Sequence, residues 1–176
     1  CVGPPPRQSL REFFHIPEEQ LEKAFRINRQ YYNTIGISEY TPVPGMCELI
    51  GRLYGAGWKL YTGTSKVEWA TKKILKELDI LQYFTALGAA DDDGVTRQSK
   101  PDVLRYTLDT LGAPQPAVLI GDRKYDVLGA HEAGIDCIAI TFGYGSREEL
   151  AACRPTHIAD SIADIEAILK QEEADV

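Results

Sequence analysis

Ala117-Val118-Leu119-Ile120-Gly121-Asp122-Arg123-Lys124-Tyr125-Asp126 is the stretch that decides the fold of this 176-residue chain. Its four apolar residues predict a buried strand, and the glycine after them lets the backbone turn sharply. A helix is expected to follow directly, so Asp122 lies at the strand tip and Asp126 lies one helical turn further on. The two carboxylates are therefore expected to face the same space at the end of a strand.

Short apolar strands alternate with helices from residue 44 onward. The expected strands are 58–61, 85–88, 117–120, 137–141 and 157–159. The expected helices are 46–54, 67–78, 101–111, 125–133 and 162–169. A further short helix is expected to begin at a capping box of Ser146 and Glu149. This alternation predicts an α/β fold with a parallel sheet covered by helices on both faces. Ligands bind such sheets at the carboxyl ends of the strands, so we expect the functional residues to lie just after each strand.

Residues 1–41 have a different pattern, because they are polar and helical and contain no strand signal. A short helix is expected over 9–14, and a longer one begins at Pro17 and ends at Gly36. The chain is therefore expected to divide into a helical unit, residues 1–41, and an α/β unit, residues 42–176.

The composition excludes several classes of protein. A formal net charge of −7 argues against a basic surface for nucleic acid. No apolar run approaches the ~20 residues that span a bilayer, which excludes a membrane helix. None of the four cysteines forms a C-x-x-C pair, so zinc-ribbon and thioredoxin-type sites are not expected. Since the chain can bury a core without disulfides, we expect a cytoplasmic location.

Asp122 and Asp126 are candidate metal ligands. Converging carboxylates are hard oxygen ligands, and Mg²⁺ is the expected metal because it favours carboxylates together with phosphate and water. The alternative is that both acids complement the positive end of a helix. Arg123 and Lys124, which lie between them, are expected to point to solvent.

Two further positions point to an anionic ligand. Thr64 and Ser65 follow the first expected strand and precede a helix, a place that suits a phosphate. The alternative is that their hydroxyls cap that helix. Lys100 opens the helix over 101–111, where the helix dipole disfavours a cation, so we expect it to have an anionic partner. The alternative is a solvated lysine.

This ordered set of motifs resembles the haloacid dehalogenase superfamily of hydrolases. The resemblance is greatest to its phosphoglycolate phosphatase-like and 5′-nucleotidase-like members with an α-helical cap. It is carried by Thr64-Ser65-Lys66, Lys100 and Gly121-Asp122 with Asp126, and further by Gly3-Pro4-Pro5, Pro44-Gly45, Asp93-Gly94 and Gly143-Tyr144-Gly145-Ser146.

The resemblance implies a Rossmann-like three-layer core with a mostly parallel sheet over residues 42–176 and a partial helical cap over residues 1–41. It implies Mg²⁺-dependent hydrolysis of a phosphomonoester through an aspartyl-phosphate. Thr64 and the N–H of Ser65 would then bind the phosphoryl group, and Lys100 would offset its charge. Asp122 would ligate Mg²⁺, and Asp126 would do so directly or through water.

The first motif of that family, D-x-D-G-T, carries the nucleophile and the general acid/base, and it is absent from these residues. The nearest match is Asp91-Asp92-Asp93-Gly94, which follows the wrong strand and is rejected as a nucleophile. The missing strand would be central, between the strand that ends at Thr64 and the one that ends at Ile120. We therefore expect a preceding segment that carries it. The alternatives are a truncated, inactive relative or a strand supplied by another chain.

The expected substrate is a small phosphomonoester, with phosphoglycolate first and a 5′-nucleotide second. The chain alone is expected to be inactive, and a catalytically inactive phosphate-binding or regulatory protein is the non-enzymatic alternative. A dehalogenase is disfavoured because it would need no metal, and a receiver-type signalling domain because it would not account for residues 1–41. The assembly is expected to be a monomer or a homodimer.

Overall fold

Parallel strands form the core of the protein. This computed structural model describes residues 6–92, 96–97 and 99–174, so the expectations for Gly3-Pro4-Pro5 and Asp93-Gly94 lie outside the described residues. The strands are β1 (Leu60–Val67), β2 (Phe84–Ala90), β3 (Val118–Gly121), β4 (Asp136–Ile140) and β5 (His157–Ala159). Every strand pairing in the described residues is parallel, which confirms the predicted fold class.

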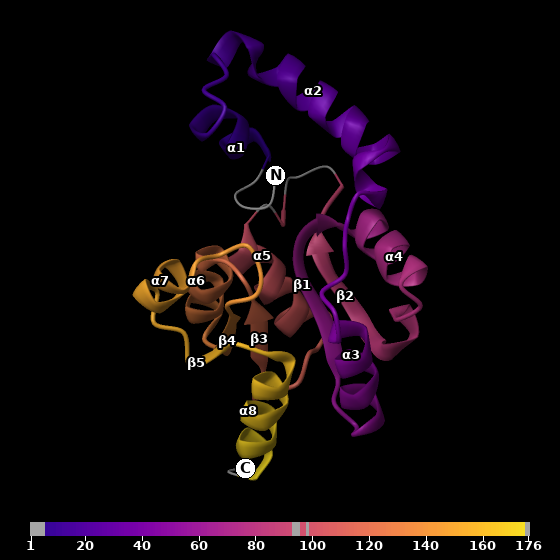
Figure 1. The fold of residues 1–176 in the computed structure, drawn as a ribbon. Helices are drawn as coiled ribbons and strands as arrows, with labels where there is room; N and C mark the ends of the chain where they lie inside the picture. The colour runs from indigo at the N-terminus through magenta and orange to yellow at the C-terminus, as the bar shows by residue number, and fades with distance from the viewer. Residues whose placement is uncertain (1–5, 93–95, 98, 175–176) are drawn as a thin grey trace.

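The strands form two sheets rather than one. β1 pairs with β2, and β3 pairs with β4, which pairs in turn with β5, whereas no ladder in the described residues joins β1 to β3. Figure 1 shows the two groups of arrows standing apart, with α5 beside them. The sheet is therefore split at the position where the sequence predicts one further strand.

Helices cover both faces of the sheets. Along β4, Cys137 and Ala139 pack with residues of α6 (Lys124–Ala133) and α7 (Arg147–Ala152). Ile138 and Ile140 pack on the other face with α3 (Met46–Gly55) and α8 (Ile162–Ala174). This alternation follows from the two-residue period of a strand, and it produces the predicted three layers.

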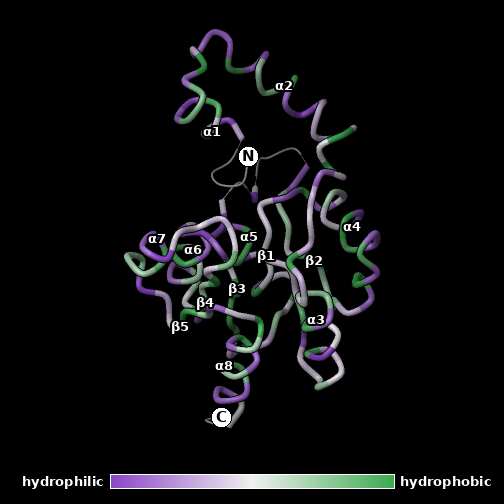
Figure 2. The backbone as a smooth tube through the Cα atoms, viewed as in Figure 1, coloured by the Kyte–Doolittle hydropathy of each residue, from purple (hydrophilic) through white to green (hydrophobic). Residues whose placement is uncertain are grey.

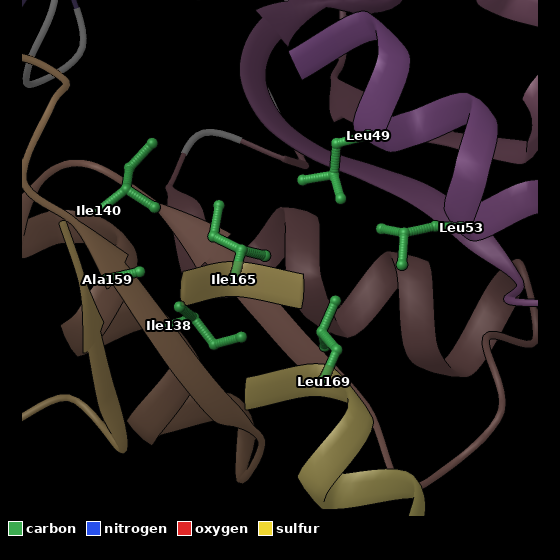
Figure 3. Packing of buried hydrophobic residues seen from close by; sticks show 7 residues of the cluster. All are labelled: Leu49, Leu53, Ile138, Ile140, Ala159, Ile165 and Leu169. Atoms are coloured by element: carbon green, nitrogen blue, oxygen red, sulfur yellow. The ribbon is translucent and has the colours of Figure 1, made fainter. Parts of the chain in front are cut away.

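The larger hydrophobic cluster lies between α3, α8 and the strands. Figure 3 shows Leu49 and Leu53 of α3 facing the side chains of Ile165 and Leu169 of α8, with Ile138 close to them. All five side chains are buried. Because this cluster joins the helix before β1 to the helix after β5, it holds the two sheets in one core.

The first helices extend away from the sheets, as Figure 1 shows. They are α1 (Pro6–Glu12) and α2 (Glu18–Thr34), followed by the 3₁₀ turn η1 (Gly36–Ser38). Figure 2 shows hydrophilic and hydrophobic segments alternating along α2, as a one-sided helix requires. Arg29 of α2 donates a hydrogen bond of 3.0 Å from Nη2 to the Asp92 carbonyl, a contact between this unit and the core. The boundary between residues 41 and 42 stays a prediction.

Several element boundaries differ from those expected. β1 continues to Val67 instead of ending at residue 61, and α4 (Glu68–Glu77) begins only after it. The helix expected over 101–111 is divided into α5 (Lys100–Arg105) and a π-helical turn, η3 (Tyr106–Thr110). At that division Thr107 donates from Oγ1 to the Val103 carbonyl at 2.8 Å, a side-chain bond that bends helices. The 3₁₀ turn η2 (Leu81–Tyr83) precedes β2.

Within the described ranges, every helix is too short or too polar to cross a membrane.

Candidate active site

Lys100 lies at the start of α5, at the carboxyl end of β1. Ser99 caps this helix in a reciprocal box with Asp102, so the position of the lysine backbone is fixed. Its ammonium donates to the Gly63 carbonyl at 2.6 Å and lies 2.8 Å from Oδ1 of Asp126. The prediction that this lysine has an anionic partner is confirmed. Lys100 therefore connects β1 with α6 across the interruption between the two sheets.

Asp126 uses both carboxylate oxygens within the protein. Oδ1 faces the Lys100 ammonium, and Oδ2 accepts from the backbone N–H groups of Asp122 at 3.1 Å and Arg123 at 3.0 Å. The side chain is only 12% exposed, so these bonds replace most of its hydration. Asp126 therefore acts as an acid at a helix N-terminus, as the alternative interpretation holds, through its two backbone hydrogen bonds. In addition, its other oxygen orients the Lys100 ammonium.

Asp122 keeps one oxygen for a ligand. Its Oδ2 accepts from the Tyr144 N–H at 2.8 Å, and its carbonyl accepts from the Gly145 N–H at 3.0 Å. No hydrogen bond to its Oδ1 is found among the described residues. A Cβ at Gly143 would collide with the Asp122 side chain, so a glycine is needed there for the loop to approach so closely. The sequence motif Gly143-Tyr144-Gly145 thus has a physical role: it holds this carboxylate.

Thr64 and Ser65 belong to β1 and do not cap α4. The N-cap residue of α4 is Val67, and no side chain caps that helix end, so the capping alternative is wrong. The Thr64 hydroxyl instead accepts from the Lys66 N–H at 3.2 Å. Thr64 directly follows Gly63, whose carbonyl receives Lys100, and therefore lies at the same edge of the sheet. The phosphate-binding roles of Thr64 and Ser65 stay predictions.

Arg123 does not point to solvent as expected. Its Nε lies 2.9 Å from Oε1 of Glu149, and its side chain is 18% exposed. The same oxygen accepts from the Lys124 N–H at 3.0 Å, whereas the Lys124 side chain is exposed, as predicted. Ser146 accepts from the Glu149 N–H at 3.1 Å, so only this half of the predicted capping box forms. The Arg123 guanidinium is the main cause that lowers the pKa of Glu149.

Asp91 belongs to the acidic stretch that was rejected as a nucleophile, and it forms hydrogen bonds within the protein. Both carboxylate oxygens of Asp91 accept hydrogen bonds, from the Thr96 N–H at 2.6 Å, the Thr96 hydroxyl at 2.8 Å and the Arg97 N–H at 3.2 Å. These bonds tie Thr96 and Arg97 to Asp91, the residue that follows β2. The rejection of this stretch as the nucleophile stays a prediction.

The residues at this edge fit a divalent cation only in part. Asp122 offers a free carboxylate oxygen, whereas both oxygens of Asp126 are already engaged. No group of three or more His, Cys, Asp or Glu side chains that could hold a metal occurs among the described residues. Mg²⁺ commonly uses one or two carboxylates with water and substrate phosphate, so Asp122 is a suitable anchor for a site that needs further oxygens.

A cavity of about 370 Å³ lies at the opposite end of the strands. It is lined by Trp58 just before β1, by Ala117 and Val118 at the start of β3, and by Asp136 at the start of β4. None of the predicted site residues contributes to it. The cavity therefore marks the interruption between the sheets at their amino ends, rather than the place where chemistry is expected.

The family model described as haloacid dehalogenase-like hydrolase matches residues 1–140. The chain belongs to this family. A 5′-nucleotidase of Pseudomonas aeruginosa is 32% identical over 170 residues, which are 96% of this chain and 76% of that protein. A phosphoglycolate phosphatase of Salmonella typhimurium is 28% identical, over 84% of this chain and 59% of its own length. The tyrosine-protein kinase PtkA of Mycobacterium tuberculosis is 37% identical over 145 residues, which are 82% of this chain and 49% of that protein. The chain thus spans about half to three quarters of these relatives.

Solved structures of haloacid dehalogenase-like proteins share the fold. A crystal structure described as a predicted phosphatase from Clostridium acetobutylicum aligns with a TM-score of 0.88 at 33% identity, over 96% of this chain and 78% of that one. A haloacid dehalogenase-like hydrolase from Streptococcus pneumoniae aligns with a TM-score of 0.86 at 31% identity, over the same shares. The predicted family and fold are therefore confirmed.

Proposed function

We propose that this protein is a Mg²⁺-dependent phosphatase that hydrolyses a small phosphomonoester at the carboxyl ends of β1 and β3. The observation that carries the proposal is the position of the Lys100 ammonium, which contacts the Gly63 carbonyl and Asp126 at once. This arrangement fixes a cation at the sheet edge that carries Thr64, held by the carboxylate of Asp126, which also accepts the Asp122 N–H. A fixed cation, a hydroxyl and a carboxylate at one sheet edge suit a phosphoryl group.

In this proposal each residue has a separate task. The Thr64 hydroxyl and the Ser65 N–H bind oxygens of the phosphoryl group, and Lys100 offsets the negative charge that builds up during transfer. Asp126 keeps the lysine in place and holds the start of α6 through its two backbone hydrogen bonds. Since Lys100 is positioned before substrate arrives, no reorganisation is required during the reaction.

Asp122 is the residue that would anchor Mg²⁺, with Asp126 reaching it at most through water. When bound, the cation would draw charge from the phosphate oxygens and so favour attack on phosphorus. The loop over Gly143 and Tyr144 supports this role, because it fixes one Asp122 oxygen and leaves the other available.

The nucleophile and the general acid/base are proposed to reside on a strand inserted between β1 and β3. Two observations support this: the sheets are unpaired at this position, and a cavity separates the amino ends of β1 and β3. Each orphaned backbone group on the facing edges costs about 1–3 kcal/mol if buried, and an inserted strand would pair them. Its aspartate would attack phosphorus, the substrate alcohol would leave with a proton from the acid, and water would then release phosphate.

The coding sequence ahead of Cys1 tests the inserted strand. An apolar strand that ends in D-x-D-G-T is expected there. A stop codon without such a motif would contradict this part of the proposal and favour an inactive relative.

Two substrate classes remain in the proposal. The sequence resemblance ranks phosphoglycolate first, whereas the relative named 5′-nucleotidase has the higher identity and is matched over more of its length than the phosphoglycolate phosphatase. This difference supports keeping a nucleoside 5′-monophosphate as a candidate beside phosphoglycolate. We also propose a cytoplasmic location, which the free thiols of Cys47, Cys137 and Cys153 support.

A substrate panel tests the function. The product of the entire reading frame is incubated with phosphoglycolate, nucleoside 5′-monophosphates and sugar phosphates, and released phosphate is measured with and without Mg²⁺. Turnover of one class, abolished by EDTA and restored by Mg²⁺, is expected. Phosphate binding without release from any substrate would identify an inactive relative, and absence of phosphate binding would overturn the site itself.

A further inference from the structure

The carboxyl end of β1 leaves the parallel ladder immediately after Thr64. Thr64 pairs with Ala89 and Val67 pairs with Ala90, so two residues of β1, Ser65 and Lys66, have no counterpart in β2. Such bulges redirect side chains, and they are frequent beside active sites. The Lys66 N–H donates to the Thr64 hydroxyl, which ties this irregular segment to a residue of the proposed phosphate site.

Lys66 is electrostatically coupled to the same site. Desolvation is the main cause that lowers the pKa of its ammonium, Lys100 lowers it further, and Asp122 raises it. The residue nevertheless remains accessible to solvent, as a ligand-binding group must be. Since Lys66 follows Thr64 by two residues at the carboxyl end of β1, it adds a second lysine to the edge of the sheet that already holds Lys100.

The two ammonium groups differ in their partners. Lys100 is neutralised by Asp126 at 2.8 Å, whereas no carboxylate lies within ion-pair distance of Lys66 in the described part of the chain. A partly desolvated cation beside another cation is stabilised when an anion arrives. The anion that the proposed function brings to this edge is a phosphate.

We propose that Lys66 is a further substrate-binding residue, whose ammonium contacts the non-bridging oxygens of the phosphate. This inference rests on the proposed function and adds a residue to its site. Lysine binds phosphate as a point charge through a flexible stem, so it can follow the ligand without a rigid geometry. Because the contact is already made to the bound phosphate, its loss weakens binding more than it slows any later step.

Binding of inorganic phosphate to the product of the entire reading frame, in the presence of Mg²⁺, tests this inference. Affinities are measured by calorimetric titration for the unmodified chain, Lys66→Ala, Lys66→Arg and Lys76→Ala. Lys76 is an exposed lysine at the far end of α4, and its substitution removes the same charge away from the site. Lys66→Ala is expected to weaken binding about tenfold, Lys66→Arg to retain most of it, and Lys76→Ala to change it less than about twofold.

The outcomes separate this inference from the proposed function. If the unmodified chain binds phosphate and Lys100→Ala loses it, while Lys66→Ala binds like Lys76→Ala, Lys66 is not a ligand and the phosphate site stands. If the unmodified chain does not bind phosphate, the proposed site and this inference are both overturned. Circular dichroism shows whether each variant is folded, and Lys66→Arg provides a second, charge-conserving comparison.

Discussion

Gly129 of α6 lies directly against the aliphatic stem of Lys100, so closely that a Cβ added at Gly129 would be 2.5 Å from Cγ of the lysine. Glycine is unfavourable within a helix, and its presence here leaves the space in which Lys100 passes α6 toward Asp126. Packing at residue 129 therefore controls the position of an ammonium that belongs to another helix.

Gly129→Ala is expected to displace Lys100 and lower phosphate affinity about tenfold. Alanine favours a helix over glycine by about 1 kcal/mol, so any loss of stability would come from the contact with Lys100. The matched control is Gly55→Ala at the end of α3, where an added Cβ has nothing within 4 Å. Calorimetric titration and thermal unfolding measure both effects, and equal behaviour of the two variants would refute the positioning role of Gly129.

Lys100→Ala is expected to lower the free energy of unfolding by about 3 kcal/mol, because it leaves the carboxylate of Asp126 without its cation in a poorly hydrated place. The two side chains are 14% and 12% exposed. Denaturant unfolding gives the value. The control is Lys73→Ala, which removes an exposed pair with Glu77 on α4 and should cost at most about 0.5 kcal/mol. Similar losses in both variants would show that the Lys100 pair is no more stabilising than a surface pair.

Glu149→Gln is expected to destabilise the protein near neutral pH and to have little effect in acid. The Arg123 guanidinium keeps the pKa of Glu149 below its ordinary value in the folded state. The pair therefore adds stability above the unfolded-state pKa of glutamate, and this is lost as the pH falls through the lower, folded-state pKa. Thermal unfolding across pH measures it, with the exposed Glu48→Gln as control. A destabilisation that does not change with pH would rule out the ion pair as its cause.

Cys137 is expected to resist alkylation in the folded protein. Burial is the main cause that raises the pKa of its thiol to about 12, and the side chain is inaccessible in the core between β4 and α6. Cys47 and Cys153 are partly exposed and serve as internal controls. A short pulse of iodoacetamide at mildly alkaline pH, followed by peptide mass mapping, should label these two and spare Cys137 until denaturant is added. Labelling of all three at equal rates would contradict the packing of this core.

Local sequence signals predicted the elements because they depend on short periods. The apolar run 117–120 followed by Gly121 located β3, and the proline after Lys100 located the start of α5. The end of β1 was misplaced because Thr64, Ser65 and Lys66 are polar and give no hydrophobic strand signal. The strand continues because Thr64 and Val67 pair with Ala89 and Ala90 of β2, with Ser65 and Lys66 between these two pairs.

The sequence named candidate residues for the site but could not predict the contacts between them. The sequence indicated that Lys100 has an anionic partner, yet it could not say that the Gly63 carbonyl is the second acceptor. The Arg123–Glu149 pair was missed because 26 residues separate its members, a distance that no periodic pattern encodes. Gly129 was overlooked for the same reason, since its significance depends on a lysine of another helix.

We propose that Asp122, at the same sheet edge as Lys100 and Thr64, supports metal-dependent phosphate chemistry. The measurement that tests it most directly is hydrolysis of p-nitrophenyl phosphate by the product of the entire reading frame, compared between the unmodified protein and Asp122→Asn with and without EDTA. Loss of one carboxylate charge from a metal anchor should reduce turnover about a hundredfold or more, and EDTA should abolish it in the unmodified protein. Turnover that is unchanged both by the substitution and by chelation would contradict the account.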